Sequence, residues 1–351
     1  LQLDSNIVSG TLPATIGNLS CLISINLDNN FISGTIPADF GKLLNMETFS
    51  LGQNNLIGTI PFQLGDLTEL QQLVLGYNYL SGNFPDSLER LIKLQHLLLP
   101  FNNLVGALPA SYKSLSNLTT FNVFNNTLTG PISDVFCNMP RLTYLTLGYN
   151  ALSSSLPPCL SGLPQLVYLD LYDNAITGTI PATFSQFPAM RVLYLSRNNL
   201  HGSVDIFCEV GALSQLYLQY NAFSGPLPHC IDQMPLLINL FLSNNLFTGS
   251  IPAESWGSKQ GLVTLDISQN SLTGTLPSAL SNITDLKYLY LFGNYFTGTV
   301  PPSYSRLRHL RLLMLQDNKL TGPITGIFDI SWQTKLDTVQ LSGNAFTGTL
   351  P

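Results

Sequence analysis

The hydrophobic and polar residues of this chain follow one pattern that recurs from end to end. The pattern is LxLxxN, in which leucines alternate with other residues before an asparagine. Its asparagine stands at fifteen positions: Asn6, Asn30, Asn54, Asn78, Asn102, Asn126, Asn150, Asn174, Asn198, Asn221, Asn245, Asn270, Asn294, Asn318 and Asn344. The first eight spacings are 24 residues, and the later ones run from 23 to 26. A fixed period of this length predicts a solenoid of stacked coils over the whole chain.

One copy of the repeat shows what each position does. From Leu166 to Leu171, the alternation predicts a short strand whose leucines point inward and whose other residues point outward. Asn174 follows where the backbone turns away from the strand, and its side chain can bond turn amides that have no other partner. Stacked copies therefore predict a ladder of asparagines along the solenoid.

The second half of each copy contains a glycine, a proline and further apolar residues. Gly178 suits a bend that needs a positive φ or a close approach of the next coil. Pro181 ends a second short extended segment, and Phe184 and Phe187 cover the side opposite the strand. Because one coil cannot bury its leucine face alone, stacking of all the copies predicts a continuous core.

The complete pattern, LxxLxLxxNxLxGxIPxxLxxLxxL, resembles the plant-type leucine-rich repeat. The resemblance implies an α/β solenoid: a right-handed superhelix of about 15 coils with a parallel concave β-sheet, a second short sheet after the glycine, and an irregular or 3-10 convex side. Such domains form the ectodomains of cell-surface receptors, or secreted inhibitors similar to polygalacturonase inhibitors. They bind proteins, peptides or glycans.

The repeats run through residues 1–351 as a single solenoid. The family normally has cysteine-containing caps at both ends, and neither is present in this chain. Leu1 begins midway through a strand, and Pro351 stops midway through a coil. Because an uncapped solenoid would expose its core at each end, we expect this chain to be a segment of a longer one.

Composition and charge remove several classes of function. Charged residues make up 10 % of the chain, against roughly 25 % in typical domains, and the formal net charge is −6. This is unlike the basic surface of a nucleic-acid binder. In this segment, no apolar run reaches the length of about 18 residues that a membrane span needs. No nucleophile–base set, phosphate loop or metal-ligand cluster is found, so we expect no enzyme, no cofactor and no metal site.

Four of the five cysteines recur at one spacing. Cys137 and Cys159 are 22 residues apart, and so are Cys208 and Cys230. In a coil of 24 residues, this spacing puts each pair on adjacent coils within reach of a disulfide. Four buried free thiols are the alternative. The duplicated spacing favours two disulfides, and Cys21 is expected to be a packed free thiol.

Four N-x-S/T sequons, each expected at an exposed position, occur at Asn18, Asn117, Asn125 and Asn282. An asparagine-rich sequence produces several such motifs by chance. Together with paired cysteines, they favour an extracellular or cell-surface location.

Function is expected at the outward positions of the concave sheet. The central outward residues are Gln2, Asn26, Ser50, Val74, Leu98, Asn122, Thr146, Asp170, Tyr194, Tyr217, Phe241, Asp266, Tyr290, Met314 and Gln340. Outward aromatic rings leave apolar area in water, which is typical of a binding surface. The candidate ligand-binding residues are Tyr144, Tyr168, Tyr172, Tyr194, Tyr217, Tyr220, Phe241, Tyr288, Tyr290, Phe292, Arg191 and Arg197. Alternatively, the rings form cross-strand ladders that stabilise the sheet.

The charged residues near this stripe also have interpretations that involve no ligand. Arg191 and Arg197 flank the stripe and could bind a carboxylate or a sugar hydroxyl, but such arginines are more often solvated. Asp170 and Asp173 could bind calcium together, although a solvated face is the favoured interpretation.

Two hypotheses of function follow. The first is an extracellular recognition module that binds a protein, peptide or glycan through the aromatic stripe. The second is a structural or assembly component of a cell coat, wall or extracellular fibre, in which self-assembly matters more than a ligand. Low charge and many neutral polar residues fit the second hypothesis, and the aromatic bias of the later copies fits the first.

Overall fold

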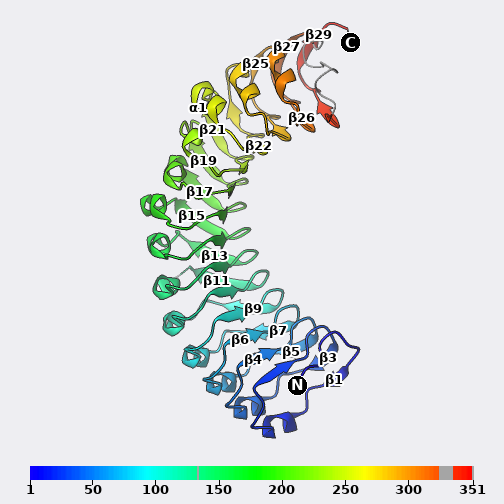
Figure 1. The fold of residues 1–351 in the computed structure, drawn as a ribbon, viewed down its shortest axis with the longest axis vertical. Coiled ribbons are helices and arrows are strands. Elements are labelled where there is room, and N and C mark those ends of the chain that lie inside the picture. Colours follow the sequence, from blue (N-terminus) through cyan, green and yellow to red (C-terminus); the bar gives the residue numbers. More distant parts are fainter. Residues whose placement is uncertain (133, 324–334, 350–351) are drawn as a thin grey trace. The chain divides into compact units, whose positions relative to one another are not determined.

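The structure is a computed structural model that describes residues 1–132, 134–323 and 335–349. The chain divides into two compact units, and each is built from the same coil (Figure 1). The first unit comprises Leu1–Ile176 and Phe187–Ala189, and the second comprises Thr177–Gln186 and the chain from Met190 onward. Pro351 lies outside the described residues. The expectations of a single solenoid and of a longer parent chain therefore stay predictions.

Three-residue strands form a parallel main sheet in each unit. In the first unit they are, in order, β2 (Ser24–Asn26), β4 (Thr48–Ser50), β6 (Gln72–Val74), β8 (His96–Leu98), β10 (Thr120–Asn122), β12 (Tyr144–Thr146) and β14 (Tyr168–Asp170). In the second unit they are β16 (Val192–Tyr194), β18 (Gln215–Tyr217), β20 (Asn239–Phe241), β22 (Thr264–Asp266), β24 (Tyr288–Tyr290), β26 (Leu312–Met314) and β28 (Thr338–Gln340). The first and third residues of each strand face away from the core, and we call that side of the sheet the open face.

A second set of short parallel strands follows the asparagines. They are β1 (Ser9–Thr11), β3 (Phe31–Gly34), β5 (Asn55–Gly58), β7 (Tyr79–Gly82), β9 (Asn103–Gly106), β11 (Thr127–Pro131), β13 (Ala151–Ser154), β15 (Ala175–Thr179), β17 (Asn199–Gly202), β19 (Ala222–Gly225), β21 (Leu246–Gly249), β23 (Ser271–Leu272), β25 (Thr297–Gly298), β27 (Lys319–Pro323) and β29 (Ala345–Thr347). The expectation that this sheet comes after the glycine was wrong. The strands begin near the asparagine, and most contain the glycine at or near their end. Gly178 has a φ of +86°, which bends the chain out of the strand.

Short helices complete the coils on the side away from the main sheet. The 3-10 helices are η1 (Ala14–Asn18), η2 (Ala38–Lys42), η3 (Phe62–Asp66), η4 (Asp86–Arg90), η5 (Ala110–Ser114), η6 (Asp134–Asn138), η7 (Pro158–Gly162), η8 (Ala182–Gln186), η9 (Asp205–Glu209), η10 (Ile231–Gln233), η11 (Ser278–Asn282) and η12 (Pro302–Arg306). One α-helix, α1 (Ala253–Ser258), occupies this position in the coil that follows Asn245. Across the described ranges, no helix has the length and apolar character needed to cross a bilayer.

The predicted inward residues form the core. Leu166, Leu169 and Leu171 are fully buried, as is Phe184, and Phe187 is nearly so. Each leucine packs against its counterparts in the adjacent coils, because the period of the strand keeps all of them on one side. The predicted repeat solenoid is therefore confirmed within each unit.

The asparagine ladder is also confirmed, and Asn78 shows its geometry. Its Nδ2 donates to the carbonyl oxygen of Leu51 in the preceding coil at 3.0 Å and to that of Leu75 in its own coil at 3.1 Å. Its Oδ1 accepts the backbone N–H of Leu56 at 3.0 Å. Only 6 % of Asn78 is exposed. The side chain thus replaces the water that these buried backbone groups have lost.

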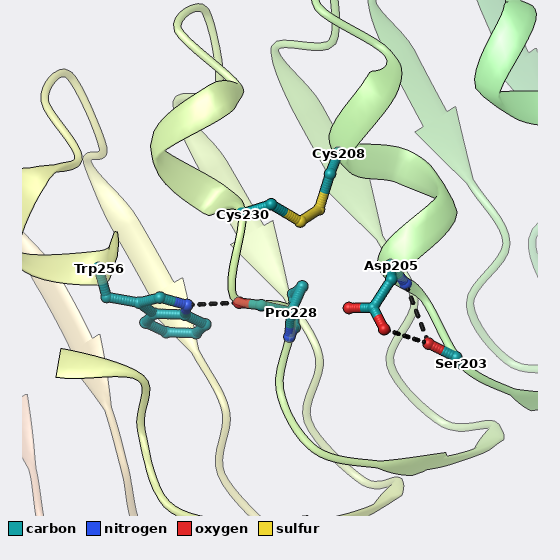
Figure 2. Close-up of a disulfide and its surroundings, with 6 residues drawn as sticks. All are labelled: Ser203, Asp205, Cys208, Pro228, Cys230 and Trp256. Carbon is teal, nitrogen blue, oxygen red and sulfur yellow. Dashed lines mark hydrogen bonds between the residues drawn. A yellow bond between two sulfur atoms is a disulfide. The ribbon is translucent and has the colours of Figure 1, made fainter. Parts of the chain in front are cut away.

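Three buried aromatic side chains join adjacent coils in a way that the repeat pattern does not reveal. Each donates a hydrogen bond to a proline carbonyl one coil earlier: Tyr112 to Pro85 at 3.1 Å, Tyr304 to Pro277 at 3.3 Å, and Trp256 Nε1 to Pro228 at 2.7 Å. Figure 2 shows the indole of Trp256 pointing at Pro228. Proline cannot donate, but its carbonyl accepts, so these positions suit a large apolar ring that carries one donor.

Both predicted disulfides are present. Cys137 of η6 is bonded to Cys159 of η7, and Cys208 of η9 is bonded to Cys230 just before η10 (Figure 2). The Cα atoms of each pair are 5.6 Å apart. Adjacent coils bring residues 22 apart into this range because the offset of two residues is absorbed by the helical segment.

The expectation that Cys21 is packed was wrong, because its free thiol is exposed. Cys21 lies in the turn between η1 and β2. The same position in later copies carries polar residues, namely Asn45, Glu69, Lys93, Asn117 and Arg141. A comparison of copies at this position would have predicted the exposure.

Candidate functional site

The clearest aromatic cluster of the second unit lies on the open face of its main sheet. Tyr194, Tyr217 and Phe241 end β16, β18 and β20, and these strands pair in register. The rings of Tyr194 and Tyr217 stack with centroids 4.2 Å apart, and those of Tyr217 and Phe241 stack at 4.9 Å. The planes within each pair differ by 7° and 12°. We call these three residues the ring stack.

Stacking determines which parts of the rings a ligand can reach. Tyr217 has a neighbouring ring over each face, and Tyr194 and Phe241 each have one face covered by Tyr217. All three residues are half-buried. The hydroxyl of Tyr217 donates to Oε1 of Gln215 at 2.9 Å. Stacking thus leaves Tyr217 without a face on which a sugar ring could stack.

A carboxylate continues the same line of residues. Asp266 of β22 pairs in register with Phe241 on one side and Tyr290 on the other. Its Oδ1 accepts hydrogen bonds from Ser268, at 2.6 Å from Oγ and 3.1 Å from the backbone nitrogen. Burial raises the pKa of Asp266, and the hydrogen bonds from Ser268 oppose that rise. Burial, together with the charge of Asp266, raises the pKa of the Tyr290 phenol.

The two predicted arginines lie at opposite edges of the sheet. Arg191 precedes β16 and Arg197 follows it, and both are exposed. The guanidinium carbon of Arg197 lies 4.9 Å from the centre of the Tyr220 ring, a cation–π contact. Arg197 and Tyr220 therefore form a pair at the edge, separate from the ring stack. Tyr288 and Phe292, both half-buried, flank Tyr290 along its own strand.

The remaining predicted residues belong to the first unit and form two separate groups. The rings of Tyr144 and Tyr168 approach to 6.1 Å on the open face, where β12 and β14 pair. Tyr172 lies instead at the edge of the sheet, against Tyr149. The single stripe predicted from the sequence is thus several clusters of rings.

The sequence predicted one ring, Tyr172, of a column of five at the edge of the first main sheet, but not the column itself, which we call the ledge. Its members and centroid distances are Tyr77 to Phe101, 4.4 Å; Phe101 to Phe124, 5.5 Å; Phe124 to Tyr149, 6.0 Å; and Tyr149 to Tyr172, 6.1 Å. Tyr77, Phe101 and Tyr149 have φ values of +58°, +54° and +58°. Bulky residues rarely adopt this conformation. A comparison across the copies of the residue that precedes each ladder asparagine would have revealed these three rings.

A hollow of about 420 Å³ on the first unit was missed as well. Apolar Val74 and Leu98 line it together with Asn26, Asn122 and Asp28. The sequence placed the first four of these side chains outward but did not single them out, because they are not aromatic. The lining contains carboxylates and no basic residue, so it suits a neutral or cationic group rather than an anion.

The expectation that Asp170 is solvated was wrong, because only 6 % of it is exposed. Its Oδ1 accepts the backbone N–H of Tyr172 at 2.9 Å and lies over Gly148, which has no side chain to displace it. Burial raises the pKa of Asp170 to about 6, and the hydrogen bond from Tyr172 opposes that rise. No group of three or more possible metal ligands occurs in the described part of the chain.

The raised pKa of Asp170 predicts a dependence of stability on pH. The folded protein holds this proton up to about pH 6, whereas the unfolded chain releases it near 3.8, so the contribution of Asp170 to stability falls between pH 4 and 6. Asp170→Asn keeps the acceptor for Tyr172 and removes the charge. In urea denaturation at pH 7, we expect the free energy of unfolding of the variant to exceed that of the wild type by about 3 kcal/mol. The difference should shrink toward pH 4, and an equal difference at both pH values would contradict ionisation as its cause.

The sequons differ in exposure, against the expectation that all four are exposed. Asn18 and Asn282 are exposed, and Asn117 and Asn125 are half-buried. Nδ2 of Asn117 donates to the carbonyl oxygen of Ile92 at 2.8 Å, which draws its side chain onto the preceding coil.

Known proteins share this sequence pattern and this fold. The family described as "Leucine-rich repeat region" matches residues 1–211, and "Leucine rich repeat" matches residues 260–320. Receptor-like protein 19 of Arabidopsis thaliana is 33 % identical over 92 residues, which are 26 % of this chain and 9 % of that protein.

Solved structures of plant receptors align over nearly the whole chain. The plant peptide hormone receptor RGFR1, in complex with RGF2, is 32 % identical with a TM-score of 0.91, covering 98 % of this chain and 58 % of that one. A TDR receptor is 33 % identical with a TM-score of 0.92, covering 100 % of this chain and 60 % of the receptor. The chain thus spans less than two thirds of the length of these relatives.

The family match and the geometry of the coil agree. Residues 1–211 are more than half of the 351 residues, and the buried leucines, the asparagine ladder and the strand after it occur in both units. The fold and the receptors that resemble it are those of recognition modules rather than enzymes. The chain belongs to the plant-type leucine-rich repeat family.

Proposed function

We propose that this chain is part of an extracellular or cell-surface receptor-like protein and binds a peptide, or an extended segment of a protein, on the open face of its second unit. The observation that carries the proposal is the ring stack of Tyr194, Tyr217 and Phe241, which Asp266 and Tyr290 continue in register. One of the similar solved structures is that of a plant peptide hormone receptor, which supports the same ligand class.

The geometry favours a peptide over a glycan. A sugar ring stacks on the face of an aromatic ring, and in the ring stack both faces of Tyr217 and one face each of Tyr194 and Phe241 are covered. An extended peptide can lay apolar side chains along the ring edges and can bond the tyrosine hydroxyls through its backbone. Asp266 can accept a hydrogen bond from an amide, or from a basic side chain when it is ionised.

The two disulfides and the exposed sequons Asn18 and Asn282 support the extracellular part of the proposal. Disulfides persist in oxidising compartments, and glycans are added to proteins on the secretory route. A structural or assembly role for the chain stays an alternative prediction, and the following experiment distinguishes it.

The test replaces Tyr194, Tyr217 and Tyr290 by serine in one variant. Linear peptides are first selected from a displayed library on the wild-type protein, and their affinities are then measured by titration calorimetry. We expect the triple variant to lose at least about 100-fold in affinity, because each aromatic anchor contributes about 1–2 kcal/mol. The control is Tyr295→Ser, which removes an exposed tyrosine of the same unit outside the open face and should leave affinity unchanged.

Thermal melting shows whether the triple variant is folded. If the triple variant does not fold, the single variant Tyr290→Ser, which leaves the ring stack intact, replaces it in the test. Wild-type affinity in a folded triple variant would overturn the proposed site. Selection of neutral oligosaccharides instead of peptides would overturn the ligand class. Concentration-dependent assembly of the wild type in sedimentation, abolished in the triple variant, would favour the assembly role.

A further inference from the structure

The hollow of about 420 Å³ on the first unit follows a row of outward residues on the main sheet. In register across β2, β4, β6, β8 and β10, the row consists of Asn26, Ser50, Val74, Leu98 and Asn122. All of these residues except the buried Ser50 line the hollow. Strands about 4.8 Å apart put the two ends of the row about 19 Å from each other, which is the length of about six residues of extended peptide.

Compact residues leave the space of this hollow open. In three successive copies, the position two residues before the ladder asparagine is occupied by Gly52, Gly76 and Pro100, which all line the hollow. A Cβ atom on Gly52 would lie 3.3 Å from Oδ1 of Asp28 and 3.5 Å from Cγ1 of Val74. The open space therefore adjoins a carboxylate and an apolar side chain at the same point.

The two carboxylates of the hollow come from the first two copies and lie at one end of it. Both oxygens of the half-buried Asp28 are 2.7 Å from Oγ of Ser50, which donates to them, and Oδ1 also accepts the backbone N–H of Gly52 at 2.6 Å. These bonds hold the carboxylate in place. Asp4 adds an exposed carboxylate from the preceding coil. None of the described residues that line the hollow is basic, so this end attracts a cation.

The rest of the row is apolar in the middle and carries an amide at each end. Val74 and Leu98 are half-buried neighbours on β6 and β8. The Oδ1 atom of each terminal amide accepts the backbone N–H two residues later, at 3.1 Å for Asn26 and 3.0 Å for Asn122. Neither Nδ2 donates a hydrogen bond to another residue that the structure describes. Both Nδ2 groups can therefore donate to the carbonyl groups of a ligand.

We propose that this hollow binds the side chain of a lysine or arginine carried by an extended peptide segment. The cationic group contacts Asp28, and its alkyl stem lies on Val74 and Leu98. The amides of Asn26 and Asn122 donate to backbone carbonyls of the peptide. A free polyamine fits less well, because its charges are spread along its length whereas the carboxylates lie at one end. The site shares the peptide class with the proposed function but none of its residues.

The test titrates the whole chain with acetylated and amidated hexapeptides, Ala-Ala-X-Ala-Ala-Ala, observed by nuclear magnetic resonance of the peptide. X is lysine, arginine, glutamate or norleucine, which has an alkyl chain without a charge. We expect the lysine and arginine peptides to bind at least about tenfold more tightly than the norleucine peptide, because a hydrogen bond to a carboxylate is charge-assisted. Raising the salt concentration to about 1 M should reduce this preference.

Two substitutions locate the preference for a cation in the hollow. Asp28→Asn keeps an acceptor for the N–H of Gly52 and removes the charge, so the lysine peptide should bind no more tightly than the norleucine peptide. The matched control is Asp66→Asn, which neutralises an exposed carboxylate of η3 outside the hollow and should leave the preference unchanged.

Gly52→Ala tests the space of the hollow without altering any charge. Its methyl group would lie between Asp28 and Val74, and we expect the lysine peptide to lose at least about fivefold in affinity. Thermal melting shows whether each variant is folded, and Gly52→Ala replaces Asp28→Asn in the test if the latter does not fold.

The outcomes separate this inference from the proposed function. Equal affinities of the lysine and norleucine peptides for the wild type contradict the inference, as does a preference for lysine that persists in folded Asp28→Asn. Tighter binding of spermidine than of the lysine peptide makes a free polyamine the occupant and contradicts it too. The variant with serine in place of Tyr194, Tyr217 and Tyr290 should retain the preference for lysine. If the wild type shows no such preference but still binds peptides through the ring stack, the inference fails and the proposed function stands.

Discussion

Replacement of Asn78 by alanine is expected to lower the free energy of unfolding by about 4 kcal/mol. Asn78 Oδ1 accepts the N–H of Leu56, and its Nδ2 donates to the carbonyls of Leu51, Leu75 and Gly76 at 3.0, 3.1 and 3.3 Å. Alanine leaves the buried N–H of Leu56 without a partner, and each of the three carbonyl oxygens loses one hydrogen bond but keeps another. The unsatisfied N–H costs about 1–3 kcal/mol and each lost hydrogen bond about 0.5–1.5 kcal/mol, so the sum exceeds the effect of most single substitutions.

The measurement is urea denaturation of the wild type and the variant, with the shift in midpoint converted through the slope of the transition. Asn6→Ala is the matched control, because Asn6 is exposed and its amide donates only to Leu3 and Asp4 of its own coil. We expect its effect to stay below about 1 kcal/mol. Equal effects of the two substitutions would contradict the role of burial and of the bond between coils.

Replacement of Trp256 by alanine is the second large effect that we expect, at about 4–5 kcal/mol. Trp256 of α1 is fully buried, and its Nε1 donates to the carbonyl oxygen of Pro228 at 2.7 Å (Figure 2). The substitution removes the largest buried side chain of the described residues and leaves a cavity between adjacent coils. Rigid neighbours can fill only part of such a cavity, so both the transfer energy and the packing contacts are lost.

A companion substitution, Trp256→Phe, distinguishes the hydrogen bond from the volume. Phenylalanine keeps most of the ring but leaves the Pro228 carbonyl without a donor, which we expect to cost about 1–3 kcal/mol. Urea denaturation checks both variants, and amide hydrogen exchange around α1 and η10 locates the loss. If Trp256→Phe were as damaging as Trp256→Ala, the bond to Pro228 would outweigh the packing, contrary to our expectation.

The repeat pattern predicted most of the fold, and one copy shows why. Leu166, Leu169 and Leu171 alternate in a strand, so their burial follows from the backbone period alone. The ladder asparagines follow from the turn after the strand, which leaves backbone groups that need a partner. The paired spacing of cysteines predicted both disulfides, because adjacent coils convert a difference of 22 residues into a neighbouring position.

The sequence predicted less of the candidate site. Outward positions were identified, but the contact between rings was not, so the stacking of Tyr194 on Tyr217 changed the ligand class that the surface favours. The burial of Asp170 was missed because it depends on a glycine, Gly148, in the preceding coil. The alternation of residues along one strand does not predict the size of the side chain at the neighbouring position of the adjacent strand.

The sequence by itself determined the coil, its period, its core, the asparagine ladder and the two disulfides. These features depend on short-range backbone geometry that every copy repeats, so each of the fifteen copies gives the same prediction. The tertiary structure alone decided which rings cover one another and which carboxylate is desolvated. Those properties arise between side chains of adjacent coils, at positions where the repeat leaves the residue type open, and they therefore differ from coil to coil.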